Sequence, residues 1–282
     1  MSMTQLVAII LTLIAFGMGL ELSLQDFSRT FKAPKSLALG LLGQCILLPC
    51  IATALACCIP NPLIALGLLL IAVCPGGASS NYMTFLARGN VALSVSLTAL
   101  NSCLAVVTVP LLFNGASSLA LGYTVDVQLP VAKTMTSTFL YTVLPVLLGM
   151  LVRQRFRSFA ARAASPIAGA AFLLLLALTP FLIARHVQAL VPLIGAVLLW
   201  VSILLAIAMP TGYGLGRLGA LPVADRRTLA VEIGVQNVAL ALFLALSFFK
   251  DNPQLVAVPV GYLFPMYVFV PGLVLLSRRG YA

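Results

Sequence analysis

Residues 231–238 read Val231-Glu232-Ile233-Gly234-Val235-Gln236-Asn237-Val238, so three strongly polar side chains interrupt an otherwise apolar stretch. Glu232 is the one carboxylate of the chain that we do not expect in a loop. A charge at membrane depth is costly, so residues of this kind face the protein interior and mark ion or substrate pathways. We therefore interpret Glu232 as a cation ligand. The alternative is a structural carboxylate paired to a neighbouring hydroxyl.

The composition around this stretch is that of a membrane protein. The 282 residues are 62% hydrophobic and 8% charged, whereas about a quarter of the residues in soluble domains are charged. A bilayer span needs about 20 apolar residues, and the first segment lacks the cleavage site of a removable signal peptide. The sequence predicts an all-α polytopic protein with about nine spans, near residues 3–20, 36–58, 62–86, 91–113, 131–151, 166–184, 188–212, 228–249 and 255–277.

The net charge of +10 is explained by topology rather than by nucleic-acid binding, because the basic residues are scattered at segment ends. If alternate loops are assigned to one side, only Lys133, Arg185 and Lys250 lie opposite the other thirteen basic residues. The positive-inside rule makes the basic face cytoplasmic. We therefore expect the N-terminus outside and the C-terminus inside. Because no targeting extension precedes the first span, we expect a bacterial inner membrane. The thirteen are Arg29, Lys32, Lys35, Arg88, Arg153, Arg155, Arg157, Arg162, Arg217, Arg226, Arg227, Arg278 and Arg279.

Within this basic face, residues 153–162 carry four arginines. Such a cluster could bind anionic lipid head groups. Four positive charges in one cytoplasmic loop are also ordinary topology determinants. From the sequence alone, the second interpretation is favoured.

Two of the predicted spans contain breaks. Residues 74–81 read Cys-Pro-Gly-Gly-Ala-Ser-Ser-Asn, and neither the proline nor the paired glycines would sustain a regular helix. Residues 232–237 form the second break. The broken spans are the third and the eighth of the nine predicted spans. Because successive spans alternate in direction and five is an odd number, the later one crosses the membrane in the opposite direction, as in an inverted repeat. A five-helix repeat would then lack its first helix here. Paired broken helices indicate the midplane site of a secondary transporter, although a packing kink at 74–81 is the alternative.

The ends of broken helices can bind ions of both signs. Exposed N–H groups favour an anion, and exposed carbonyl groups favour a cation. The oxygens of Ser80, Asn81, Glu232 and Gln236 are hard ligands that suit sodium. Three further polar residues lie in apolar spans: Ser94 and Thr98 share one helix face, and Gln44 is a lone amide. Taken alone, hydroxyls of this kind more often serve packing.

These motifs resemble those of the bile acid:sodium symporter family, with this chain similar to its bacterial nine-span members. The resemblance covers nearly the whole length and rests on residues 16–20, 74–90 and 232–237. It implies one integral membrane transporter over residues 1–282. A core domain of about residues 36–113 and 188–277 would contain two crossed discontinuous helices. A panel domain would comprise about residues 3–20 and 131–184.

The resemblance also implies the site residues. One sodium ion would be held by Ser80, Asn81, Ser94, Thr98 and Glu232. A second would be held by Gln44, Glu232, Gln236 and main-chain carbonyls near Ile233 and Val235. Ala78, Ser79 and Asn237 would face the substrate. Sodium would be a transported ion rather than a prosthetic group.

The function that these expectations define is sodium-coupled import of an organic anion by alternating access, with two sodium ions per anion. The substrate would be a pantoate-like or bile-acid-like carboxylate, and the pantoate-like acid is favoured because the chain resembles a bacterial protein. The alternatives are a proton-coupled transporter of organic anions and a membrane sensor that does not transport. An enzyme is disfavoured, because one intramembrane carboxylate without a histidine or a second acid at depth provides neither an aspartyl pair nor a zinc site. The expected partners are the anion, sodium and membrane lipid, without nucleic acid.

Overall fold

The computed structural model describes residues 2–23, 34–122 and 127–278. Three of the basic residues counted above, Arg29, Lys32 and Arg279, lie outside these ranges. The described elements are helices, in the order α1 (Met3–Glu21), α3 (Pro34–Leu42), the π-helical turn η1 (Gly43–Leu47), α4 (Leu48–Ala56), α5 (Pro62–Val73), α6 (Ala78–Leu86), α7 (Val91–Leu121), α8 (Val131–Thr138), the π-helical turn η3 (Phe139–Val143), α9 (Leu144–Arg155), α10 (Arg157–Arg185), α11 (Val187–Leu190), η4 (Val191–Leu193), α12 (Ile194–Leu218), α13 (Val223–Gly234), α14 (Val238–Phe248), η5 (Pro253–Val256) and α15 (Ala257–Arg278).

The all-α polytopic class is confirmed. Six continuous helical segments in the described ranges are long and apolar enough to cross a membrane. The count of nine spans stays a prediction, because the helices on either side of each break are too short to span a bilayer separately. Several helices also extend beyond the predicted apolar segments; α10, for example, begins at Arg157 rather than near residue 166.

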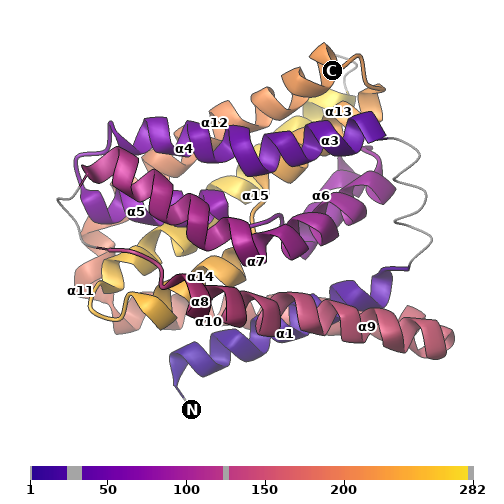
Figure 1. The fold of residues 1–282 in the computed structure, drawn as a ribbon, viewed down its shortest axis with the longest axis horizontal. Coiled ribbons are helices and arrows are strands. Elements are labelled where there is room, and N and C mark those ends of the chain that lie inside the picture. Colours follow the sequence, from indigo (N-terminus) through magenta and orange to yellow (C-terminus); the bar gives the residue numbers. More distant parts are fainter. Residues whose placement is uncertain (1, 24–33, 123–126, 279–282) are drawn as a thin grey trace.

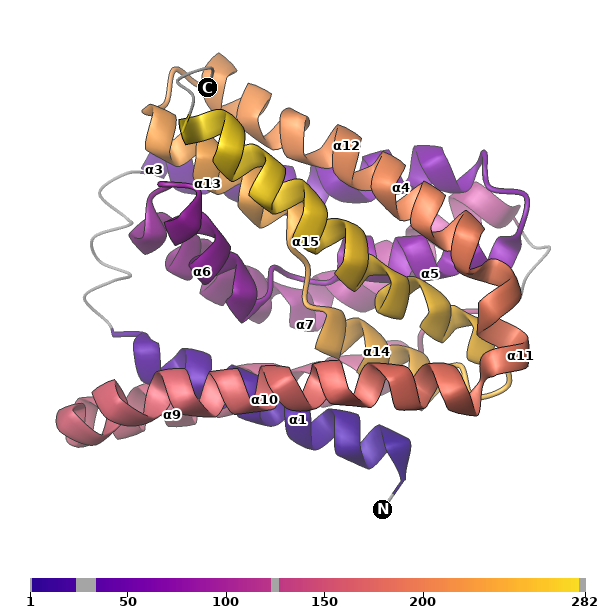
Figure 2. The ribbon, with the colours of Figure 1, turned by 180° about the vertical axis from the view of Figure 1, so that it is seen from behind.

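The helices form two groups (Figure 1). Helices α1, α9 and α10 pack against one another along one side of the molecule, and α3–α7 and α12–α15 form the other group. Helix α8 continues into α9 through η3, and the short α11 lies between α10 and α12 in the chain. Helices α1 and α9 approach closely at two glycines: a Cβ atom on Gly19 would overlap the Val146 carbonyl, and one on Gly149 would overlap the Phe16 carbonyl. Such contact between backbones is a common way for membrane helices to associate. The view from behind shows α10 lying across α1 (Figure 2).

Both predicted breaks are confirmed. Helix α5 ends at Val73 and α6 begins at Ala78, while α13 ends at Gly234 and α14 begins at Val238. The two short linkers cross as an antiparallel pair at Gly76 and Gln236. The Asn237 N–H donates to the Pro75 carbonyl at 2.9 Å, and the Gly77 N–H donates to the Val235 carbonyl at 3.4 Å. Backbone groups released by one break are thereby paired with those released by the other, as a water-poor interior requires.

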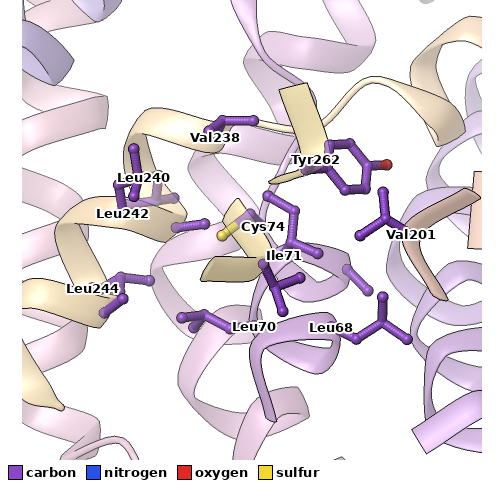
Figure 3. Packing of buried hydrophobic residues seen from close by; sticks show 14 of the residues in the cluster. Leu68, Leu70, Ile71, Cys74, Val201, Val238, Leu240, Leu242, Leu244 and Tyr262 are labelled. Carbon is purple, nitrogen blue, oxygen red and sulfur yellow. The ribbon is translucent and has the colours of Figure 1, made fainter. Parts of the chain in front are cut away.

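The crossing is held in a dense apolar core. Residues 64–73 of α5 and residues 238–245 of α14 are buried without interruption, as expected for helices that are apolar all round. Figure 3 shows Leu70 and Ile71 of α5 near Leu240 and Leu242 of α14, with Cys74 between these helices. The buried Tyr262 of α15 donates its hydroxyl to the Gly234 carbonyl at 2.9 Å, which satisfies a C-terminal carbonyl of α13 that has no partner within the helix.

The expectation that every carboxylate except Glu232 lies in a loop is wrong. Glu21 is the last residue of α1, and Asp225 lies in the first turn of α13. Helix α13 begins five residues before the predicted span because a helix can continue beyond its apolar stretch. An acidic residue in the first turn is also stabilised by the helix dipole.

Candidate functional site

Glu232 lies at the end of α13 with its carboxylate directed at α6 and α7. Its side chain is 1% exposed. Its Oε1 atom accepts hydrogen bonds from Ser94 and from Ser80, the latter at 2.6 Å, and its Oε2 atom accepts one from Thr98 at 3.0 Å. Ser80 lies in the first turn of α6, and Ser94 and Thr98 are one turn apart on α7. Side chains from three helices therefore meet at one carboxylate.

The same cluster contains Asn81, whose Oδ1 atom lies 3.0 Å from the Ser94 hydroxyl and shares the single proton of that hydroxyl with Glu232. All five residues predicted for the first sodium site are thus brought together, and all are buried. Among the described residues, no lysine or arginine is paired with Glu232. In the described ranges, the groups that donate to this carboxylate are all hydroxyls. Because a serine or threonine hydroxyl has two lone pairs besides its proton, the same oxygens can turn to coordinate a cation.

A second polar group lies on the other side of the crossing. Gln44 donates through Nε2 to the Cys74 carbonyl at 2.9 Å and to Gln236 Oε1 at 2.8 Å. Gln236 donates to the Ile233 carbonyl at 2.8 Å. The Gln44 Oε1 atom is buried and accepts no hydrogen bond within the described ranges, which is uncommon for a buried amide. It is therefore available to a cation.

The second predicted sodium site is only partly assembled. Gln44, Gln236 and Ile233 are joined by hydrogen bonds, but the carboxylate oxygens of Glu232 bond to the α6 and α7 hydroxyls instead. The Val235 carbonyl accepts the Gly77 N–H. Gln44 is placed by the π-helical turn η1, which precedes Pro49. Proline has no N–H to donate to the preceding turn, and π-helical turns of this kind are frequent at functional sites.

The three predicted substrate-facing residues, Ala78, Ser79 and Asn237, lie at the starts of α6 and α14 and line one cavity of about 690 Å³. No side chain caps the first turn of α6. Asn237 caps α14 through its Oδ1 atom, which accepts the Leu240 N–H at 3.0 Å. Its NH₂ group has no partner in the described part of the chain. Two half-helix N-termini and one amide therefore offer donors to an anion in this cavity.

The walls of the cavity are mostly apolar and come from both groups of helices. The aromatic residues Phe85 of α6, Phe172 of α10 and Tyr267 of α15 all line the cavity. The rings of Phe172 and Tyr267 are in edge-to-face contact, with their centroids 5.9 Å apart. Glu21 is the one charged side chain among the described lining residues. The sequence indicated the donors at the helix breaks, but it gave no signal for these walls, because apolar residues that line a cavity resemble those that face lipid.

Asp225 is a structural residue of the site that sequence reasoning missed. It is 6% exposed, and it accepts hydrogen bonds from the Ser36 hydroxyl at 2.6 Å and from Asn90 Nδ2 at 2.9 Å. These three residues lie at the starts of α3, α7 and α13. About two helical turns further along, the same helices carry Gln44, Thr98 and Glu232. Asp225 therefore fixes the relative heights of the helices that provide the polar clusters. The nearby Arg226 and Arg227 made this segment resemble a loop.

We predict that Asp225→Ala will destabilise the protein, because it removes two hydrogen bonds to a charged group, each contributing about 1.5–3 kcal/mol. The thermal unfolding midpoint of the purified protein in detergent should fall clearly below that of the wild type. Asp251→Asn, in an exposed turn, removes the same charge as a control and should leave the midpoint unchanged. Equal midpoints for the two variants would show that Asp225 does not join the three helices.

Comparison with known proteins places these features in a family. The model of the sodium bile acid symporter family matches residues 8–193. A probable chloroplastic sodium/metabolite cotransporter, BASS2, of Oryza sativa subsp. japonica is 34% identical over 259 residues, which cover 91% of this chain and 59% of that protein. The uncharacterized sodium-dependent transporter YocS of Bacillus subtilis (strain 168) is 31% identical over 249 residues, or 86% of this chain and 74% of that protein.

Human sodium/bile acid cotransporter 4 is 32% identical over 257 residues, which cover 89% of this chain and 56% of that protein. The chain thus spans about three fifths of the length of several curated relatives that it matches. In a family of sodium symporters, sodium is a transported ion and not a prosthetic group. The match covers more than half of the chain, and the chain belongs to the sodium bile acid symporter family.

Proposed function

We propose that this protein is a sodium-coupled secondary transporter that imports an organic anion by alternating access. The observation that carries the proposal is the buried Glu232 carboxylate, which is surrounded by neutral oxygen ligands at the crossing of two broken helices. The starts of the two half-helices α6 and α14 face a cavity from the same crossing. A cation and an anion bound there would each stabilise the arrangement that the other requires.

Sodium is the cation that the ligands favour. The first proposed site consists of Glu232, Asn81 and three hydroxyl groups, and the second adds the free Gln44 oxygen and main-chain carbonyls. Uncharged oxygens and a carboxylate suit hard cations. The names of the rice and Bacillus subtilis relatives also support sodium dependence. A proton on Glu232 is the alternative, since a protonated carboxyl group would also remove the buried charge.

Binding of sodium and binding of the anion would be coupled because both ligands bind at the crossing of the two broken helices. Sodium binding would neutralise Glu232 and fix both linkers, and the half-helix N-termini would then bind the anion more tightly. Such coupling is reciprocal, so the anion would also tighten sodium binding. Two sodium ions with one monovalent anion would carry net charge inward, and transport would be electrogenic.

The polarity of the cavity lining helps to distinguish between the two candidate substrate classes. Its polar groups are confined to the helix breaks, while its walls are largely apolar. Of the two substrate classes that the sequence suggests, the bile-acid-like carboxylate offers more apolar area to these walls than a pantoate-like acid does. The cavity therefore favours an amphipathic anion, with its carboxylate at the crossing and its apolar part between α6 and α10.

We also propose how the helices divide into two domains and how the chain is oriented in the membrane. Helices α1, α8, α9 and α10 would form the panel domain, and α3–α7 with α12–α15 the core domain, which would rock against the panel around the site. Nine spans would put the N-terminus outside and the basic face in the cytoplasm, in a bacterial inner membrane.

We predict that Glu232→Ala will abolish sodium-dependent uptake into proteoliposomes. Removing one partner of a buried ion pair costs about 3 kcal/mol or more, which corresponds to a loss of more than about 100-fold in sodium affinity. Asp251→Asn is the control. Near-normal sodium-dependent uptake by Glu232→Ala would refute the ligand assignment. If uptake by the wild type did not depend on sodium concentration but increased with an imposed pH gradient, this result would support the proton-coupled alternative.

We predict that Asn237→Ser will weaken binding of the organic anion more than binding of sodium. Serine still caps a helix, so the variant keeps α14 intact while removing the NH₂ group that faces the cavity. The half-saturating concentrations of the anion and of sodium for uptake measure the two effects. A larger change for sodium than for the anion would instead place Asn237 among the cation ligands.

A further inference from the structure

A second cavity, of about 930 Å³, lies where α1 ends, α9 ends and α10 begins. It shares Glu21 and Ser165 with the first cavity but differs from it in charge, because Arg153 and Arg157 both line it. The Glu21 carboxylate offsets one of these two positive charges. The charged side chains in the described lining are therefore cationic on balance, and the cavity attracts anions.

The two arginines differ in how they are held. Arg153 is half-buried, and its Nη1 atom donates to the carbonyls of Leu20 and Glu21 at the end of α1. Arg157 is exposed and has no partner among the described residues. One guanidinium group is thus fixed against the helices, and the other is available in full to a ligand. Arginine is well suited to phosphate because its planar N–H groups can bind two phosphate oxygens at once.

Apart from Ser23, Gln154 and Ser165, the remaining lining is apolar. Leu147, Met150 and Leu151 of α9 face the cavity. Leu147 is 49% exposed and Leu151 is 62% exposed, which is the exposure expected of side chains that meet lipid tails. The cavity is therefore apolar one to two helical turns before the end of α9 and cationic at that end. An anionic phospholipid has the same order of polarity, from acyl chain to phosphate.

The other arginines of the cluster do not face this cavity. The Arg155 guanidinium lies over the Phe156 ring, 5.6 Å from its centroid, and Arg162 lines a separate shallow hollow. A topology determinant needs only a charge on the correct side of the membrane. The convergence of Arg153 and Arg157 on one amphipathic cavity is more specific than that role requires.

We propose that this cavity binds one anionic phospholipid, with its phosphate on Arg153 and Arg157 and an acyl chain against Leu147 and Leu151. The site stands apart from the crossing of the broken helices, and it does not depend on the proposed transport function. Its place between α1, α9 and α10 means that the lipid would contact all three helices of one group.

Native mass spectrometry of the purified full chain in detergent, titrated with phosphatidylglycerol or phosphatidylcholine, tests the proposal. The wild type should bind one phosphatidylglycerol in preference to phosphatidylcholine. An arginine that contacts the lipid phosphate should strengthen its binding by about five-fold, so Arg153→Gln with Arg157→Gln should weaken phosphatidylglycerol binding by about 25-fold. The matched control, Arg155→Gln with Arg162→Gln, removes the same charge from the same segment and should bind like the wild type.

Three results would overturn the proposal: wild-type affinity in the Arg153 and Arg157 variant, an equal loss in the control variant, or displacement of phosphatidylglycerol by an equal concentration of free glycerol phosphate. The second would indicate general attraction to a basic surface, and the third a site for free anions. If loss of the Arg153 contacts unfolds the double variant, Arg157→Gln alone decides the matter. It removes no hydrogen bond or ion pair found among the described residues and should still weaken binding about five-fold.

Discussion

The structure depends on one constraint: a carboxylate is buried in a membrane protein without a cationic side chain beside it in the described part of the chain. Glu232 receives hydrogen bonds from three hydroxyl groups, and these reduce but do not cancel the cost of burying its charge. A mobile cation can supply the missing charge, whereas a fixed arginine would hold the site permanently in one state. The absence of a fixed partner in the described residues is thus what makes the site suitable for coupling.

The two helix breaks make this arrangement possible. Each break releases backbone groups that would be costly inside a bilayer, and the antiparallel pairing around Gly76 and Gln236 satisfies several of them. Those left over at the starts of α6 and α14 face a cavity, where a ligand can bind them. The unwound backbone therefore places a cluster of cation ligands and a set of anion donors side by side. Outside the crossing, Tyr262 of α15 donates to the last residue of α13, and Asp225 joins the start of α13 to Ser36 and Asn90.

Much of the site could be predicted from the sequence because its residues violate the rules of an apolar span. Pro75, the paired glycines and the polar run around Glu232 signalled the breaks, and the spacing of Ser94 and Thr98 placed both on one helix face. Asp225 could not be found in this way, because a charged residue beside two arginines resembles a loop. The side to which Glu232 turns was equally hidden, since several hydroxyls and amides lie within one helical turn of the break. The cavity walls consist of ordinary apolar residues and carry no sequence signal.

The central claim is that the charge of Glu232 is balanced by a bound cation. Anomalous X-ray scattering from crystals grown with thallium(I), a heavy substitute for sodium, tests this claim most directly. The account predicts a thallium peak within coordination distance of the Glu232 carboxylate and the hydroxyl oxygens of Ser80, Ser94 and Thr98, and the loss of this peak when sodium is in excess. A peak elsewhere with none at the crossing, or a Glu232 side chain paired with a lysine or arginine, would contradict it.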